Sequence, residues 1–162
     1  MSENEKSNPL ILEIKGNSLD DGPGIRSVVF FKGCPLSCVW CHNPESKRSV
    51  QEIYFDETAC VGCATCREVC PKDALSPDNP GYIDRSRCNF CFLCVDQCPA
   101  RALSRVGVHM GIDDIVQEIL PDKPFFHTSG GGVTLSGGEP TLYPDFCSQL
   151  LKELKNEHMH TL

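Results

Sequence analysis

The chain has 162 residues and a mass of 17.9 kDa, enough for one compact domain or for one domain with a small insert. It carries 15 basic and 22 acidic residues, and this formal net charge of −7 argues against a nucleic-acid-binding protein. The first nine residues are polar and the apolar runs are short, so neither a signal peptide nor a membrane span is expected. Twelve cysteines without an export signal indicate metal ligands in a reducing, cytoplasmic compartment rather than disulfides.

Three predicted elements precede the first cysteines. A strand is expected near Leu10–Ile14, a tight turn at Asp21–Arg26, and a second strand at Ser27–Phe31, which is rich in β-branched and aromatic residues. The turn contains Asp-Gly-Pro-Gly, a combination that favours an abrupt reversal of the chain.

A group of three cysteines lies in the loop that follows the second strand. Cys34, Cys38 and Cys41 have the spacing C-x3-C-x2-C. Three thiolates can hold three irons of a [4Fe–4S] cubane and leave the fourth iron open for a substrate. The segment Cys38–His42 also matches the C-x-x-C-H pattern of haem attachment, but covalent haem normally implies export, and Cys34 would then have no role. We therefore expect His42 to be a structural turn residue.

An internal repeat follows this loop. Each copy reads C-x2-C-x2-C-x3-C-P, first at 60–71 and again at 88–99. This is the bacterial ferredoxin pattern, in which three close thiolates hold one [4Fe–4S] cluster and the fourth reaches the neighbouring cluster. The predicted ligands of one cluster are Cys60, Cys63, Cys66 and Cys98, and those of the other are Cys88, Cys91, Cys94 and Cys70. Two zinc sites are the alternative, but zinc prefers two C-x2-C pairs separated by a longer spacer.

The remaining elements alternate between helix and strand. Apolar residues at i, i+3, i+4, i+7 and i+8 predict an amphipathic helix at 112–120, which Pro121 and Pro124 are expected to end. A short buried strand is expected at Val133–Leu135, then a glycine-rich turn, then a helix around 145–156. Cys147 shares the apolar stripe of this last helix, so we expect it to be a buried, inert thiol.

Together these motifs resemble the radical S-adenosylmethionine (SAM) superfamily, and in detail the glycyl radical enzyme activating enzymes, which include pyruvate formate-lyase activase. The resemblance runs from about residue 10 to the C-terminus. It is carried by four segments: Asp21–Arg26, Phe30–Cys34, Trp40–Pro44 and Ser129–Pro140. Pyruvate formate-lyase activase itself lacks the ferredoxin-like insert, so the sequence looks more like the insert-bearing activases.

The resemblance implies a role for each motif. Three cysteines would hold the catalytic [4Fe–4S] cluster, whose open iron SAM chelates: Cys34, Cys38 and Cys41. Four residues would contact SAM: Trp40, Gly137, Gly138 and Glu139. Core packing is the alternative for Trp40. Reductive cleavage of SAM would give a 5′-deoxyadenosyl radical, which takes a hydrogen atom from a glycine of a partner enzyme. Asp21 could help to seat the glycine loop of that partner, although the turn is its main expected role.

The implied cofactors are three [4Fe–4S] clusters and SAM, and the implied partners are a glycyl radical enzyme and a flavodoxin or ferredoxin as electron donor. The insert clusters could relay electrons, or they could form a structural or docking element. With the clusters counted at −2, −2 and −1, the net charge becomes about −12. Neither nucleic acid nor a membrane is therefore expected as a partner.

The expected fold is α/β, a partial parallel (β/α) barrel of the radical SAM type with an inserted bacterial 2[4Fe–4S] ferredoxin-like α+β domain. The expected segments are 1–51 with the cluster loop, 52–105 as the insert, and 106–162 as the continuation of the barrel. Residues 158–162 read like the start of a third strand, so we expect the N-terminal half of an activase. A half barrel leaves an open strand edge, and the isolated chain is expected to be unstable or inactive unless another chain completes it.

Two other classes of function stay open. The chain could be a ferredoxin-like electron carrier with a vestigial half barrel, or a radical SAM enzyme that acts on a small molecule. The three cysteines at 34–41 together with the Gly-Gly-Glu turn favour the activase over the carrier, because a simple carrier needs neither.

Overall fold

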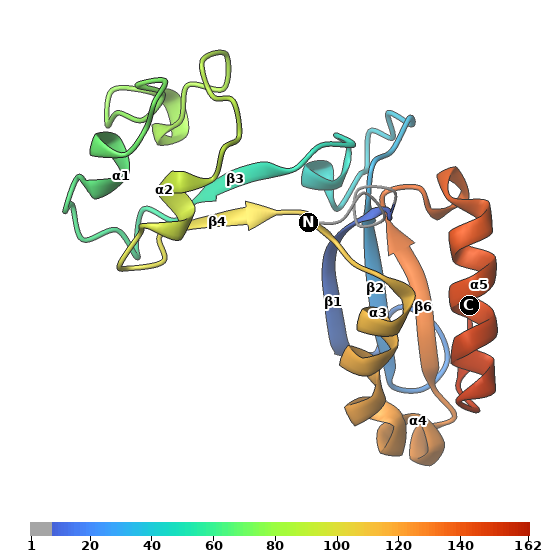
Figure 1. Cartoon of the computed structure of the whole chain (residues 1–162). Helices are drawn as coiled ribbons and strands as arrows, with labels where there is room; N and C mark the ends of the chain where they lie inside the picture. The colour runs from blue at the N-terminus through green and yellow to red at the C-terminus, as the bar shows by residue number, and fades with distance from the viewer. Residues whose placement is uncertain (1–7) are drawn as a thin grey trace. The chain divides into compact units, whose positions relative to one another are not determined.

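The computed structural model describes residues 8–162, and the expected polar tail lies almost entirely outside them. The chain divides into two compact units (Figure 1). We call them the sheet unit, which combines the residues up to Val50 with Gly107–Leu162, and the insert, Gln51–Val106. The domain boundaries expected from the sequence stay a prediction. No helix among the described residues is long and apolar enough to cross a membrane.

The sheet unit is built on five strands in the order β5-β1-β2-β6-β7. Their bounds are β1 Leu10–Ser18, β2 Arg26–Lys32, β5 Val108–His109, β6 Gly132–Gly137 and β7 His160–Thr161. Strands β2, β6 and β7 are parallel, whereas β1 runs antiparallel to β2 and to β5. Nearly every residue of β2 is buried, as expected for a central strand with a parallel neighbour.

Helices cover the sheet and close its core. Their bounds are α3 Ile112–Ile119, α4 Lys123–Ser129 and α5 Pro144–Asn156, with short 3₁₀ turns η4 Leu120–Asp122 and η5 Pro140–Leu142. The apolar stripes of α3 and α5 pack with the inward side chains of β1, β2 and β6 in one hydrophobic cluster. Cys147 is buried in this cluster, as the sequence predicts.

Two features differ from the sequence prediction. The helix expected at 112–120 ends at Ile119, before Pro121 as predicted, but Pro124 lies in the first turn of a further helix, α4, that was not predicted. Proline fits there since the amide hydrogen that it lacks has no partner in the first turn of a helix. The parallel arrangement holds only for β2, β6 and β7, and the predicted strand at 158–162 is the short β7. The architecture is therefore a mixed α/β fold.

The insert has its own small sheet and core. Strands β3 Glu52–Phe55 and β4 Leu103–Val106 pair antiparallel and bring the two ends of the insert together, with Glu52 opposite Val106. Two one-turn helices, α1 Thr65–Glu68 and α2 Leu93–Asp96, occupy equivalent positions in the two copies of the sequence repeat. Ile53, Leu75 and Ile83 are buried in a core that also contains cysteines of both copies.

Arg26 is fully buried at the amino end of β2. Its guanidinium donates to the Thr134 hydroxyl at 2.6 Å and to the Val133 and Pro23 carbonyls at 2.6 and 3.2 Å. Burial lowers the pKa of Arg26, and the nearby Asp21 carboxylate acts in the opposite direction. A charged group is tolerated inside a fold when its donors are satisfied, so Arg26 ties the Asp21 turn to β6.

We expect Arg26→Ala to destabilise the fold strongly, by about 3–5 kcal/mol, because it leaves buried acceptors on β6 without their donor. Urea denaturation followed by circular dichroism measures the change. Lys152→Ala on the exposed side of α5 is the matched loss of one positive charge and should change stability by less than about 0.5 kcal/mol. Equal effects of the two substitutions would contradict a structural role for Arg26.

Candidate iron–sulfur centres

Four of the predicted cluster ligands line one cavity of the insert. Phe55 and Tyr82 form part of its wall, and its cysteines are Cys60, Cys63, Cys66 and Cys98. Three of them come from the first copy of the repeat, and the fourth comes from the end of the second copy. The structure therefore brings together the first ligand set that the sequence predicts.

The second cavity has the complementary composition. Ile53, Leu75 and Phe92 contribute to its wall, and its cysteines are Cys70, Cys88, Cys91 and Cys94. Burial raises the pKa of Cys94 to about 11, and the neighbouring thiols of Cys70, Cys88 and Cys91 act in the same direction. Four thiolates this close repel one another in the free protein, and cationic iron would remove that penalty.

The backbone around both cavities repeats the same uncommon conformations. Positive φ angles occur in pairs at equivalent positions of the two copies: Gly62 and Phe90, Ala64 and Phe92, Asp73 and Arg101. Residues other than glycine rarely adopt positive φ, so such pairs indicate a constraint common to both copies. Backbone that alternates between right- and left-handed conformations turns successive N–H groups toward one point and forms concavities for anions, including iron–sulfur clusters.

Hydrogen bonds before each group of cysteines follow the repeat as well. The carboxylate of Asp56 accepts the N–H and hydroxyl of Thr58, and that of Asp84 accepts the same groups of Ser86. These bonds lower the pKa of both aspartates. They fix the turn that leads into Cys60 in one copy and into Cys88 in the other.

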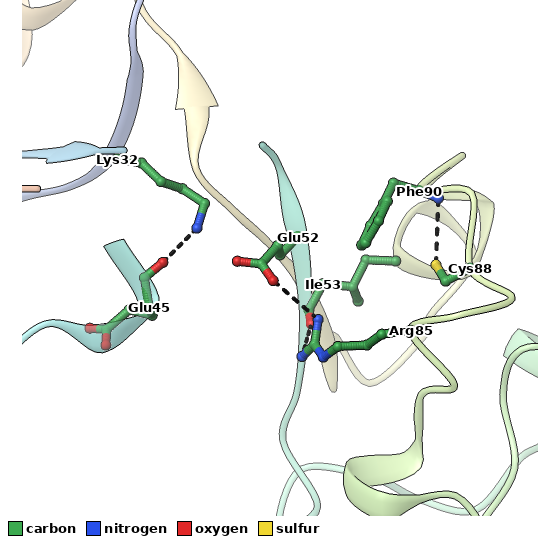
Figure 2. A network of polar contacts seen from close by, with 7 residues as sticks. All are labelled: Lys32, Glu45, Glu52, Ile53, Arg85, Cys88 and Phe90. Carbon is green, nitrogen blue, oxygen red and sulfur yellow. Dashed lines mark hydrogen bonds and ion pairs between the residues drawn. The ribbon is translucent and has the colours of Figure 1, made fainter. Parts of the chain in front are cut away.

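Backbone amides also donate to sulfur in the second cavity. The Phe90 N–H lies 3.4 Å from Cys88 Sγ (Figure 2). The Ala74 N–H lies 3.4 Å from Cys70 Sγ. Arg85 binds to β3: its guanidinium lies 3.5 Å from the Glu52 carboxylate and 3.3 Å from the Ile53 carbonyl (Figure 2). Such donors stabilise a thiolate and favour its role as a ligand.

Side-chain hydroxyls contact sulfur in the first cavity. Tyr82 Oη lies 3.3 Å from Cys66 Sγ, and burial together with this hydrogen bond raises the pKa of Tyr82 to about 12. The hydroxyl and the N–H of Thr65 both hydrogen-bond to Cys63, and these bonds lower the pKa of that thiol. Neither donor is predicted by the sequence motifs; a hydroxyl side chain directly before the third cysteine of the motif is the signal that could have found Thr65.

In the sheet unit, the loop that contains Cys34, Cys38 and Cys41 begins at the carboxyl end of β2. We call it the cysteine loop. Gly33 N donates to the Ser46 carbonyl at 2.6 Å and Cys34 N to the Lys47 carbonyl at 3.0 Å, so the loop begins and ends at one place. Lys32, buried at the end of β2, donates from Nζ to the Glu45 carbonyl at 2.5 Å (Figure 2). The end of the loop includes a short 3₁₀ turn, η2 Pro44–Ser46, and the Glu45 and Ser46 carbonyls that accept two of these bonds belong to it.

The tip of this loop faces solvent. Cys34 is partly buried, whereas Cys38 and Cys41 are exposed. Trp40 is 76 % exposed, so its interpretation as a core residue is wrong; its predicted contact with adenine stays a prediction. His42 is also exposed, near the turn at Pro44.

The glycine-rich turn adjoins the start of the cysteine loop. Gly138 N donates to the Phe31 carbonyl at 2.7 Å, and Glu139 N donates to the Gly33 carbonyl at 2.9 Å. A Cβ on Gly138 would lie 2.3 Å from the Gly33 oxygen, and one on Gly137 would lie 2.6 Å from Phe31 N. The close approach of β6 to β2 therefore requires both glycines, whatever else they bind.

The Glu139 carboxylate is held in an ionised state. Its Oε1 accepts the Thr141 hydroxyl at 2.6 Å and the Thr141 N–H at 3.1 Å, and these bonds lower the pKa of Glu139. Nearby, the thiol of Cys147 donates to the Pro140 carbonyl at 3.2 Å, and burial raises its pKa. The turn thus presents one fixed carboxylate beside the cysteine loop, an acceptor for a cationic group.

Within residues 8–162, no three cysteine, histidine, aspartate or glutamate side chains are close enough to bind one metal ion together. Each cysteine of a [4Fe–4S] cluster binds a different iron, so these ligands surround a wider space than the ligands of one zinc ion.

Comparison with known proteins identifies both iron–sulfur regions. A family model described as a 4Fe-4S dicluster domain matches residues 52–99, and one described as a 4Fe-4S single cluster domain matches residues 20–64. The second match contains Cys34, Cys38 and Cys41 of the sheet unit. The chain therefore carries iron–sulfur cluster domains in both of its units.

Similar proteins are activating enzymes. The chain is 51 % identical over 158 residues to the benzylsuccinate synthase activating enzyme of Thauera aromatica, a match that covers 94 % of this chain and 48 % of that protein. It is 46 % identical over 155 residues to the trans-4-hydroxy-L-proline dehydratase activating enzyme of Clostridioides difficile, covering 94 % and 51 %. A third relative is the choline trimethylamine-lyase activating enzyme of Oleidesulfovibrio alaskensis, at 41 % identity over 156 residues, covering 94 % and 50 %.

Along nearly its whole length the chain is similar to glycyl radical enzyme activating enzymes, as its motifs suggest. It spans about half the length of the curated relatives that it matches.

We expect Gly138→Ala to displace the turn from the cysteine loop, because the added methyl group meets the Gly33 oxygen at 2.3 Å. The predicted loss of stability is about 1–3 kcal/mol, measured by urea denaturation. Gly111→Ala is the matched control, since its methyl group meets only flexible side chains, that of Asp114 at 3.2 Å and that of Asn8 at 3.7 Å. Equal stabilities of the two variants would show that the turn does not require glycine.

Proposed function

We propose that the chain is the cluster-binding part of an activating enzyme that installs a glycyl radical on a partner enzyme by reductive cleavage of SAM. The observation that supports this most directly is the hydrogen bond of 2.9 Å from Glu139 N to the Gly33 carbonyl. This bond joins the Gly137–Glu139 turn to Gly33, the residue immediately before Cys34. A ligand on the open iron of a cluster at this loop would lie beside a fixed carboxylate.

In the sheet unit, different residues would bind the cluster and SAM. The three thiolates of Cys34, Cys38 and Cys41 would hold the cluster and leave one iron for SAM. Glu139 would accept the ammonium group of SAM, and the exposed Trp40 would pack against the adenine. When bound, the cluster supplies the electron that cleaves SAM, which yields the radical that takes hydrogen from the partner's glycine.

In the insert, the two cavities would hold one [4Fe–4S] cluster each, which makes three clusters in all. Each set combines three cysteines of one copy with the last cysteine of the other, so both clusters would cross-link the two copies. A flavodoxin or ferredoxin would supply the electrons. The anionic clusters add to an already acidic chain, so a donor with a basic face would bind best.

The protein partner would contact the cysteine loop. Three apolar side chains of this loop are exposed: Leu36 by 51 %, Val39 by 93 % and Trp40 by 76 %. Exposed apolar side chains gathered on one loop are typical of a surface that another molecule covers. The parallel strands β2, β6 and β7 would form the first part of the radical SAM barrel, with the site at their carboxyl ends.

An electron carrier is the second candidate, since the insert has a core of its own and both of its cavities are built from its own residues. In that case the cysteines of the sheet unit would have no function.

The iron content distinguishes the two candidates. After anaerobic reconstitution with iron and sulfide, we expect about twelve irons per chain, from three clusters of four. Cys34→Ala should lose about four irons and abolish the change that SAM causes in the EPR spectrum of the reduced protein. Cys147→Ala is the matched control, because that buried thiol belongs to none of the three ligand sets. About eight irons in the unsubstituted chain, with no effect of SAM, would favour the carrier.

Glu139→Gln tests the predicted contact with SAM. Loss of the charge should weaken SAM binding by about 10- to 100-fold, the usual value of a hydrogen bond to a charged group. Glutamine can still accept from Thr141 through its Oε1, so the turn should persist. Thr141→Val removes the hydroxyl bond but keeps the carboxylate, and it should bind SAM nearly as well as the unsubstituted chain. Dissociation constants follow from the SAM dependence of the EPR signal, and weaker binding by Thr141→Val than by Glu139→Gln would exclude the direct contact.

A further inference from the structure

The two cavities of the insert share one backbone pattern but differ in the side chains that contact sulfur. We propose that Tyr82 and Thr65 raise the reduction potential of the cluster held by Cys60, Cys63, Cys66 and Cys98 above that of the other insert cluster. The proposal rests on the ligand sets given under the proposed function.

The first donor is the phenol of Tyr82. Its oxygen lies 3.3 Å from the sulfur of Cys66, which is only 9 % exposed. A sulfur that binds iron carries no proton, so the tyrosine would be the donor in the cluster-bound protein. Stacking fixes the phenol in this position, since the Tyr82 and Phe55 rings are 4.2 Å apart and nearly parallel, at 16°.

The second donor is the hydroxyl of Thr65. It would donate to the sulfur of Cys63, which lies two residues before it and lines the cavity. Thr65 is the first residue of α1, and Ala64 before it has a left-handed conformation that turns the start of the helix toward the cavity. A thiolate that accepts such a bond is stabilised in its anionic form.

The second cavity has no matching hydroxyl. Leu93 at the start of α2 occupies the position in the second copy that Thr65 occupies in the first. The leucine side chain has no hydrogen-bond donor. The described residues that line the second cavity include no serine, threonine or tyrosine. The donors to its cysteines that the structure shows are the backbone N–H groups of Ala74 and Phe90.

The burial of the innermost cysteines and the position of the nearest acidic residue are nearly equal in the two copies. Cys66 and its counterpart Cys94 are 9 % and 6 % exposed. An acidic residue follows each at the same distance, Glu68 in one copy and Asp96 in the other. Arg67 stands where the second copy has valine, and its positive charge acts in the same direction as the hydroxyls.

Reduction adds one negative charge to a cluster. Donors that point at its sulfur ligands stabilise the more negative form, so they raise the potential. Two hydroxyls and the charge of Arg67 at the first cavity should outweigh the backbone donors of Ala74 and Phe90 at the second, so the first cluster should have the higher potential.

The test is an anaerobic redox titration followed by EPR, in a Cys34→Ala background that removes the signal of the catalytic cluster. We expect two midpoint potentials for the insert. Tyr82→Phe and Thr65→Val should each shift the higher one toward more negative values and leave the lower one in place. Leu93→Thr should shift the lower one toward more positive values, because it gives the second copy the missing hydroxyl.

The control is Tyr54→Phe, which removes a phenol hydroxyl from an exposed side chain of β3 and should move neither potential. Two insert clusters whose potentials do not respond to Tyr82→Phe or Thr65→Val would overturn the tuning role while the ligand sets stand. Fewer than eight irons in this background would instead overturn the ligand sets, and the tuning role with them.

Discussion

The parallel pairing of β2 with β6 is the constraint on which the candidate active site depends. The ladder runs from Arg26 opposite Gly132 to Phe31 opposite Gly137, without a break in register. Since the carboxyl ends of parallel strands lie at the same edge, the cysteine loop and the glycine-rich turn emerge side by side. Beyond the strands, the N–H groups of Gly138 and Glu139 donate to the Phe31 and Gly33 carbonyls. These two bonds extend the pairing and fix the turn against the loop.

The insert achieves the same convergence of ligands without long strands. Its two copies exchange their fourth cysteines, Cys70 and Cys98, so each cavity closes only when both copies are folded. Paired left-handed residues such as Ala64 and Phe92 turn the backbone toward the cavities. Conformations of this kind cost energy in each copy, and their recurrence indicates that bound clusters, rather than local propensity, determine the backbone.

Much of this arrangement could be predicted from the sequence, because a cluster dictates the spacing of its ligands. The ferredoxin pattern gave both cysteine sets that line the cavities, and apolar runs gave the strands at 27–31 and 133–135. Helix α4 was missed because proline was interpreted as a terminator rather than as a first-turn residue. Arg26 and Tyr82 were missed for another reason: a charged residue after a turn predicts a surface position, and Tyr82 contacts a cysteine far back along the chain, which no local motif reveals.

The two units represent opposite ways of holding a cluster, and the difference agrees with the proposed chemistry. In the insert, one cysteine of each proposed ligand set is buried, Cys66 or Cys94, and the protein would supply all four ligands. Closed sites of this kind shield a cluster and allow hydrogen bonds such as that of Tyr82 to adjust its potential. In the sheet unit, Cys38 and Cys41 are exposed on a loop that backbone hydrogen bonds anchor at its base. A substrate that must reach an iron directly needs such an open face, and a carboxylate fixed beside it, that of Glu139, would orient the substrate there.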